Sequence, residues 1–313
     1  MSDTMNIGDL QGYIQGISSL RHKYVDGTSQ ALELLFRGHS DVNYRLLPIL
    51  ARASYGVDRE RDFVELAKCK YPDVFKDGMT PVQLLALLQH YGVPTRLLDV
   101  TESALVALYF ACCSKPGIDG EVFVFRRENC GVDTAPVLNG IADTYRLTRG
   151  ADYALHHFVD AFRGQPYFDE HRHVFTDSMF EHSEEFLGVK FDEKEDKIEQ
   201  GKTIWLEKCC HNHGNPIFLY APVYTLRQQL QRGRFILFPN KIKDRSGERA
   251  FVNEVEEIPK DHKCIVQRFI IKHDAKETIL RDLELCGICE ESLFFDSIDK
   301  TCGHLTKRAA NMW

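Results

Sequence analysis

An arginine followed by a glycine ends the apolar segment at residues 32–38, and these two residue types together suit the binding of an anion. The guanidinium of Arg37 can form two parallel hydrogen bonds to a phosphate. Gly38 has no side chain to hinder the approach of a ligand to the backbone. The alternative is a structural arginine that pairs with an internal carboxylate such as Asp99. Arg37 is therefore either an anion ligand or one half of an ion pair.

A second group of polar residues lies between Gln89 and Ala111, where a helix end, a Gly-x-Pro turn, a short strand and a new helix follow one another. Either Thr101 or Ser103 can cap the new helix, which explains part of this density of polar groups. Helix capping does not account for the other polar side chains of this segment, so we interpret it as part of a binding site. Its candidate site residues are His90, Tyr91, Arg96, Asp99, Thr101 and Ser103.

The third group lies between Arg227 and Phe235. Arg227 and Gln231 are four residues apart and share one face of a predicted helix. Gly233 is suited to ending that helix as a C-cap before the next strand. Taken alone, this segment would be an exposed basic helix with a glycine stop.

Three polar groups so far apart in the sequence are best explained by a fold that joins them. We therefore predict one pocket to which Arg37, His90, Arg96, Asp99, Ser103 and Gln231 all contribute. Asp99 directly follows the apolar pair Leu97-Leu98, so we expect it to be buried. A buried charge must be paired, which predicts an ion pair between Asp99 and either Arg37 or Arg96.

Helix-like and strand-like patterns alternate along the chain and must position these residues. Helices are predicted at 6–21, 59–71, 81–91, 102–113 and 224–233, and one or two more at the C-terminal end. Strands are predicted at 32–38, 95–100, 121–127, 215–223, 234–239 and 263–272. Pro81 after Thr80 suits the first position of a helix. Residues 128–200 are the least regular, with helical patterns near 150–163 and 178–187.

Composition places the chain among ordinary globular proteins, since 43% of its 313 residues are hydrophobic and 27% are charged. The N-terminus lacks the pattern of a signal peptide, and no stretch approaches the roughly 20 apolar residues that span a bilayer. We therefore expect a cytoplasmic protein with no membrane partner. The formal net charge of −7 does not favour nucleic acid or anionic lipid as a partner.

Two groups of cysteine and histidine residues have the spacing of metal ligands. One contains Cys209, Cys210, His211 and His213, and the other contains Cys286, Cys289, Cys302 and His304. The stronger interpretation is structural, because Cys286 continues the apolar face of an amphipathic helix. We expect no bound metal.

The combined motifs resemble the FRG domain, a family named for Phe-Arg-Gly. The resemblance rests on Phe36 to Gly38, Tyr44 to Pro48, Arg52, Gln89 to Ala111, Arg227 to Phe235, and the ending around Leu283, Gly287-Ile288 and Ser292 to Phe294. This chain departs from the family pattern at His39, Val100 and Arg232. Residues 128–214 match no recognised motif.

A second resemblance, to the core of ADP-ribosyltransferases of the Arg-Ser-Glu type, implies a function. Arg37 matches the first motif, Thr101 to Ser103 with Ala107 to Ala111 the second, and Gln229 to Phe235 the position of the third. The resemblance implies NAD as substrate, catalytic roles for Arg37, His90, Asp99 and Gln231, and NAD binding by Arg37, Gly38, Tyr91, Arg96, Thr101, Ser103 and Arg227. Gln231 or Gln229 stands where that family has glutamate, and Asp99, Glu102 or Glu207 could substitute.

The fold that this resemblance implies is α+β, with a split, mostly antiparallel sheet surrounded by helices. Residues 1–240 would form the FRG-like domain and 241–313 a C-terminal α/β extension packed on it. The leading function is an NAD-dependent ADP-ribosyltransferase or NAD glycohydrolase, as in toxins or defence effectors, with an unknown macromolecular acceptor. One alternative is a non-catalytic binding or interaction module for NAD or another phosphate-containing molecule. Another is a nuclease or other phosphate-handling enzyme that uses His90, Arg96 and Asp99.

Overall fold

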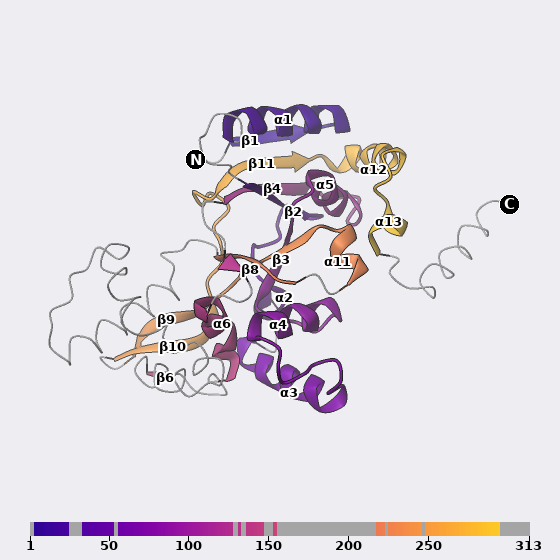
Figure 1. The fold of residues 1–313 in the computed structure, drawn as a ribbon. Coiled ribbons are helices and arrows are strands. Elements are labelled where there is room, and N and C mark those ends of the chain that lie inside the picture. Colours follow the sequence, from indigo (N-terminus) through magenta and orange to yellow (C-terminus); the bar gives the residue numbers. More distant parts are fainter. Residues whose placement is uncertain are drawn as a thin grey trace.

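The computed structural model describes residues 3–24, 33–52, 56–127, 131–132, 136–146, 153–154, 217–222, 225–245 and 248–294. These residues form one large mixed sheet flanked by helices, and a small three-stranded sheet in the order β6-β10-β9 (Figure 1). No helix among them is long and apolar enough to cross a membrane. The helical pattern predicted near 178–187 lies outside the described residues. Of the pattern near 150–163, only the two-residue strand β6 (Tyr153–Ala154) is described.

The large sheet has eight strands in the order β1-β11-β4-β2-β3-β8-β7-β5. Its neighbours are antiparallel except for β1 with β11 and β5 with β7, which are parallel. The prediction of an α+β fold with a mostly antiparallel sheet and surrounding helices is confirmed. The strands are β1 (Asp3–Ile7), β2 (Glu33–His39), β3 (Leu97–Thr101), β4 (Gly120–Arg127), β5 (Gly131–Val132), β7 (Ile217–Tyr220), β8 (Gly233–Leu237), β9 (Asn240–Arg245), β10 (Glu248–Val255) and β11 (Ile265–Ile271).

In the middle of the large sheet, the ladder between β2 and β3 contains a single residue pair among the described residues. β2 pairs with β4 over the whole length Glu33–His39, and β3 pairs with β8 from Leu97 to Thr101. In contrast, β2 pairs with β3 only where Phe36 faces Thr101. Past that pair, toward Arg37 on one strand and Asp99 on the other, no ladder continues. The sheet therefore opens between β2 and β3, and side chains from both strands can face a ligand there.

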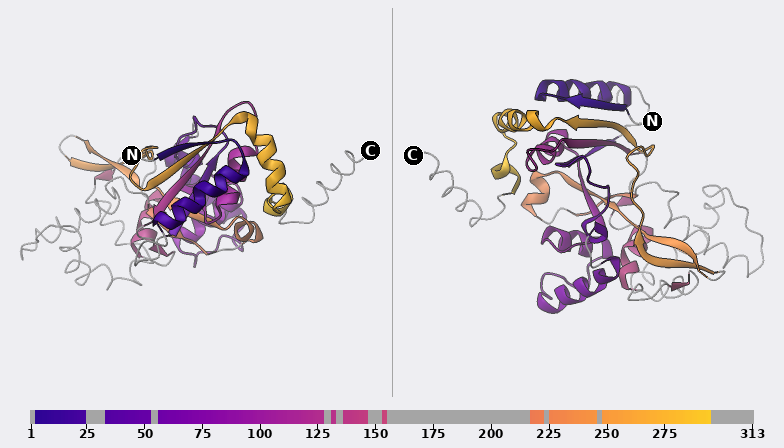
Figure 2. Two further views of the ribbon diagram at one scale, coloured as in Figure 1. Left: turned by 90° about the horizontal axis from the view of Figure 1, so that it is seen from above. Right: turned by 180° about the vertical axis from the view of Figure 1, so that it is seen from behind.

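Different helices cover the two halves. The half with β1, β11, β4 and β2 packs against α1 (Leu10–Tyr24), α5 (Ala104–Cys112) and α12 (Lys276–Leu285). The half with β3, β8 and β7 packs against α3 (Glu60–Lys70), α4 (Pro81–His90) and α6 (Pro136–Asp143). Figures 1 and 2 show α1 and α12 at one end of the molecule and α3 and α4 at the other. Three short helices lie between them, α2 (Ile49–Arg52), α11 (Leu226–Leu230) and α13 (Glu290–Phe294).

α5 crosses β2 and β4 at two glycines. A Cβ on Gly38 would lie 1.9 Å from the carbonyl oxygen of Ala107, and one on Gly120 would lie 2.3 Å from the carbonyl oxygen of Ala111. Because backbone atoms cannot move aside as a flexible side chain can, both strand positions require glycine. The sequence suggested that Gly38 keeps the backbone clear for a ligand, but the space beside its α-carbon is filled by α5.

Local signals explain where some of the helices begin. α4 begins with a capping box between Thr80 and Gln83, and Pro81 takes the first helical position as predicted. α5 is capped by Ser103. The prediction that Gly233 is the C-cap of the helix beginning near Arg227 is wrong, because the C-cap is Gln231 and Gly233 is the first residue of β8. Arg232 adopts the left-handed backbone conformation instead, with φ 47°.

Several other elements differ from the sequence prediction. The first helix begins at Leu10 rather than residue 6, and Asp3–Ile7 forms β1 against β11. α6, β9 and β10 were not predicted. β11, expected in a C-terminal extension, is an inner strand of the large sheet between β1 and β4.

Candidate functional site

A pocket with a volume of about 380 Å³ lies at the opening between β2 and β3, within the range of about 300–1,000 Å³ that is typical of small-molecule sites. Its walls come from β2, β3, the end of α4, α5, α11 and the start of β8. Phe36, Phe110 and Phe235 contribute apolar surface. Of the predicted site residues, Arg37, Gly38, His90, Asp99, Thr101, Arg227 and Gln231 line this pocket, whereas Tyr91, Arg96 and Ser103 do not.

Arg37 is held by two acceptors that carry no charge. Its Nε donates a 2.9 Å hydrogen bond to Nε2 of His39, and its Nη1 donates to the backbone carbonyl of Asp99 across the opening of the sheet. Burial lowers the pKa of Arg37 to about 10, with the charge of Arg52 acting in the same direction and Asp99 opposing it. The guanidinium is fixed in position without losing its charge to an ion pair, which is the arrangement expected of an anion site.

His39 is the residue that orients Arg37 from the same strand. A guanidinium only donates hydrogen bonds, so Nε2 of His39 must accept and the imidazole must be neutral. Burial, together with the charges of Arg37, Lys260 and Arg52, lowers the pKa of His39 to about 2. The ring also packs edge-on against Phe123, with the ring centroids 5.2 Å apart. The sequence had marked His39 only as a departure from a family pattern.

Arg52 adds a second positive charge near Arg37. It follows Ile49, which lines the pocket, by three residues in α2, so both side chains lie on one face of that helical turn. Burial lowers the pKa of Arg52, whereas Tyr44 and Asp99 act to raise it. Among the described residues neither Arg37 nor Arg52 forms an ion pair, in contrast to Arg96 and Arg234.

α11 forms the facing wall. Arg227 and Gln231 line the pocket, and Gln231 is also fixed by the sheet, since its carbonyl accepts a 2.7 Å hydrogen bond from the hydroxyl of Thr101. The same hydroxyl accepts from the backbone N–H of Ser103. The side-chain amide of Gln231 donates to the carbonyl of Leu293 at 3.1 Å. Thr101 therefore connects β3 to α11 at the bottom of the opening.

His90 ends α4 at the edge of the pocket. Its Nδ1 lies 3.1 Å from the hydroxyl of Thr225, which also caps α11 by accepting from the backbone N–H of Gln228. The contact joins the α4 wall to the α11 wall. Thr225 was not singled out in the sequence, although a threonine before a short helix is a recognisable cap signal.

The predicted buried ion pair of Asp99 is wrong. Asp99 is exposed, and the bond that joins it to Arg37 uses its backbone carbonyl rather than its carboxylate. In β3, Asp99 stands between the buried Leu98 and Val100, and strand alternation turns its side chain to the opposite face from theirs. Its carboxylate therefore lines the pocket and is available to a ligand.

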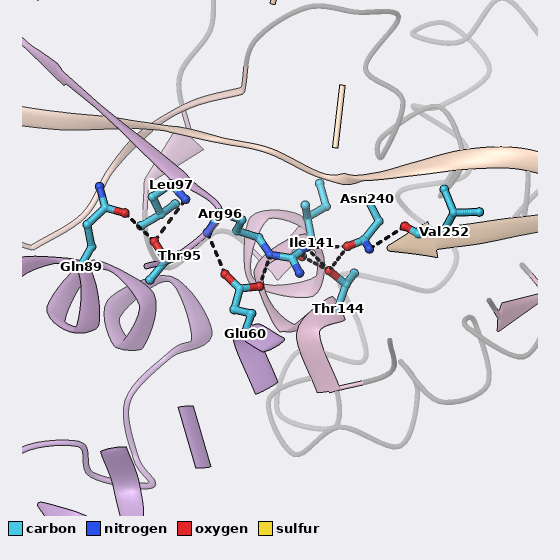
Figure 3. A network of polar contacts seen from close by, with 9 residues as sticks. All are labelled: Glu60, Gln89, Thr95, Arg96, Leu97, Ile141, Thr144, Asn240 and Val252. Carbon is cyan, nitrogen blue, oxygen red and sulfur yellow. Dashed lines mark hydrogen bonds and ion pairs between the residues drawn. The ribbon is translucent and has the colours of Figure 1, made fainter. Parts of the chain in front are cut away.

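Arg96 is not a ligand residue, contrary to the prediction, because it is fully buried at 0% exposure. Its Nε pairs with Glu60 at 2.6 Å, and Glu60 also accepts from the backbone N–H of Arg96. Nη1 donates to the side chains of Thr144 and Asn240, which tie β3 to the η2 turn (Thr144–Arg146) and to β9 (Figure 3). Arg96 and Glu60 are a structural pair between the sheet and its helices.

The two other predicted residues that lie off the pocket also have structural roles. The hydroxyl of Ser103 accepts from the backbone N–H of Val106 and so caps α5. Tyr91 is 59% exposed, and its ring packs edge-on against Phe75 and His90.

The residues singled out as metal ligands are only partly described. Cys286 is exposed rather than part of the apolar helix face. Cys209, Cys210, His211, His213, Cys302 and His304 lie outside the described residues. Within the described ranges, no group of three or more His, Cys, Asp or Glu residues could hold a metal ion.

Comparison with known families identifies one part of the chain. Residues 32–119, from the start of β2 to just before β4, match the model of the FRG domain. The match confirms the resemblance seen in the sequence and contains one wall of the pocket, with Arg37, His90, Asp99 and Thr101. No curated protein and no solved structure matches the chain.

Proposed function

We propose that this protein, which contains an FRG domain, binds NAD in the pocket between β2 and β3 and releases nicotinamide from it. It would act as an NAD-dependent ADP-ribosyltransferase or an NAD glycohydrolase. The observation that carries the proposal is that Arg37 and Arg227 line one pocket from facing elements. Neither arginine forms an ion pair within the described part of the chain, so both charges are available to the diphosphate of a dinucleotide.

The rest of the pocket suits the other parts of such a ligand. Phe36, Phe110 and Phe235 offer apolar and aromatic surface for a nicotinamide or adenine ring. Gln89 and Gln228 add side-chain amides whose oxygens accept from Thr95 and Thr225. Their N–H groups can donate to ribose hydroxyls.

The proposed reaction breaks the bond between the nicotinamide nitrogen and C1′ of the ribose. Nicotinamide leaves with the bonding electron pair, and the ribose gains oxocarbenium character that a nearby carboxylate can stabilise. Asp99 is the carboxylate among the lining residues, so we assign it this role. Water or a macromolecular acceptor then bonds to C1′ and gives up a proton. Gln231, at the position where the transferase resemblance expects glutamate, would bind the ribose.

A second candidate, binding of the same ligand without turnover, is favoured by the state of Gln231. An amide cannot provide the negative charge that the transferase family obtains from glutamate, and this amide already donates to the carbonyl of Leu293. The nuclease alternative needs Arg96, His90 and Asp99 in one site. Arg96 is buried in an ion pair with Glu60 and does not line the pocket that His90 and Asp99 line, so we do not favour it.

The test measures NAD binding by calorimetry and nicotinamide release, with and without macromolecular acceptors. We expect Arg37→Ala to weaken NAD binding roughly ten- to hundred-fold, the equivalent of a lost charge-assisted contact of about 1.5–3 kcal/mol. Gln231→Ala and Asp99→Asn should spare binding more and lower the rate of release. Arg45→Ala is the matched control, since Arg45 is 64% exposed and pairs with Glu257 outside the pocket.

The outcomes separate the two candidates. A well-folded wild type that fails to bind millimolar NAD would exclude both. Binding without release of nicotinamide would leave the non-catalytic candidate alone. Release that is unchanged in Asp99→Asn would remove Asp99 from the proposed reaction, and Asp73→Asn, an exposed aspartate that does not line the pocket, controls for the change of charge.

A further inference from the structure

The last described turn of the chain, α13, packs against the wall of the pocket formed by α11. It follows α12 after a turn at Gly287, which takes a left-handed φ of 80°. Leu293 is buried at 1% exposure within the core around α5 and α12. Figure 1 shows α13 next to α11, far along the chain from the FRG domain.

Two consecutive residues of α13 hold two pocket residues of the α11 segment. The carbonyl of Leu293 accepts a 3.1 Å hydrogen bond from the amide of Gln231. The ring of Phe294 lies under the guanidinium of Arg227, with 5.2 Å between Cζ and the ring centroid. A cation above an aromatic ring is attracted by the negative face of the π system.

Phe294 is itself fixed from the other side. Its ring meets the ring of Phe110 edge-on, with centroids 5.8 Å apart at 85°, and lies 6.4 Å from the ring of Tyr109. Phe110 lines the pocket. Phe294 therefore joins a residue of α5 to Arg227 of α11, and its own place is determined by aromatic neighbours in the core.

The choice of an aromatic partner has a consequence for charge. A carboxylate beside Arg227 would fix the guanidinium but would also neutralise it, whereas a phenylalanine ring fixes it and leaves its full charge for a ligand. The structure describes no ion pair for Arg227. Arg234, by comparison, has both a ring (Tyr220) and a carboxylate (Glu102), and it does not line the pocket.

We infer that Phe294 is a positioning residue that holds Arg227 toward the pocket, so that Arg227 and Arg37 bind the two phosphates of a diphosphate group from facing walls. The inference rests on the proposed function as far as the ligand is concerned. The contact between Phe294 and Arg227 lies within the chain, so it can be tested separately from ligand binding.

The experiment uses the full chain with Phe294→Leu, Phe294→Tyr and Arg227→Met, and the probes are NAD and inorganic pyrophosphate. Leucine keeps apolar volume but has no ring, so we expect it to weaken binding of both probes about two- to five-fold, the size of a cation–π contact. Tyrosine keeps the ring and should restore the wild-type affinity. In the Arg227→Met background, Phe294→Leu should have no further effect.

A second measurement needs no ligand. The Nε–H signal of Arg227 in an NMR spectrum should be shifted by the ring in the wild type and in Phe294→Tyr, and should lose that shift in Phe294→Leu. Wild-type binding that Phe294→Leu leaves unchanged would overturn the inference while the proposed function stands. If the wild type binds neither probe, the proposed function fails and the diphosphate role of Phe294 fails with it. A retained ring shift would then show that the contact itself exists.

Discussion

Nε of Arg37 donates a 2.9 Å hydrogen bond to Nε2 of His39, so a neutral imidazole rather than a carboxylate orients the cation at the opening of the sheet. The two residues are neighbours on the same face of β2, two positions apart. This arrangement keeps the positive charge of Arg37 available and makes the protonation state of His39 part of the site.

Replacing His39 tests whether Arg37 needs this acceptor. Glutamine offers a side-chain oxygen that can accept from Nε of Arg37, whereas leucine offers none. We expect His39→Gln to keep NAD affinity close to wild type and His39→Leu to weaken it roughly three- to ten-fold, the cost of about one hydrogen bond. Calorimetry on both variants checks this. Equal losses in the two variants would show that the imidazole acts through its shape alone.

The buried neutral His39 also predicts an acid-dependent loss of stability. The folded state keeps the pKa of His39 near 2, whereas the unfolded chain takes up a proton below about pH 6.5. The unfolded state then binds more protons, so this residue lowers stability as the pH falls below about 6.5, by up to about 1.4 kcal/mol per pH unit. Urea unfolding of wild type and His39→Gln between pH 4.5 and 7.5 should show a shallower pH dependence in the variant. Parallel curves would contradict the assignment.

Gly38→Ala should prevent or severely weaken folding. The added Cβ would lie 1.9 Å from the carbonyl oxygen of Ala107, and overpacking against backbone costs about 1–3 kcal/mol or more. Gly78→Ala is the control, since nothing lies within 4 Å of a Cβ there, and it should change stability by less than about 1 kcal/mol. Thermal unfolding of both variants measures the difference. A Gly38→Ala protein as stable as the control would mean that α5 can move away from β2.

Glu60→Gln should destabilise the protein without touching the pocket. It leaves the guanidinium of Arg96 buried and without its charged partner, which typically costs about 3–5 kcal/mol. Asp62→Asn is the surface control, since Asp62 pairs with the exposed Arg59 and such pairs contribute about 1 kcal/mol or less. Denaturant unfolding gives both values. NAD affinity of the folded fraction should be unchanged. A large loss of affinity would show that Arg96 contributes to the binding site.

The sequence predicted best the parts of the fold that depend on local signals. The helix after Thr80-Pro81 and the strand predicted at 32–38 lie close to where the cap and the short apolar run placed them, because those signals act within a few residues. The sequence could not show which of Arg37 and Arg96 faces a ligand and which is enclosed in the core. Both lie beside apolar runs, and what separates them is Glu60, Thr144 and Asn240, which reach Arg96 from distant segments.

The site residues were also predicted in part. Six residues from the three polar groups were predicted to share one pocket. Arg37, His90, Asp99 and Gln231 line it, whereas Arg96 and Ser103 do not. The burial of Asp99 was predicted wrongly, because an apolar run before a residue does not say which face of the strand it will take. β1 was missed because Asp3–Ile7 is short and largely exposed, and only its pairing with β11 makes it a strand.

The place of β11 between β1 and β4 means that the order of synthesis and the order of assembly differ. While the ribosome is still making residues 128–264, β4 has β2 on one side and an unpaired edge on the other, and β1 has no neighbour at all. Only when Ile265–Ile271 emerges can this half of the sheet close. A nascent chain with an open edge is prone to pair with other chains. We therefore expect a product released near residue 240 to aggregate more readily than the full chain.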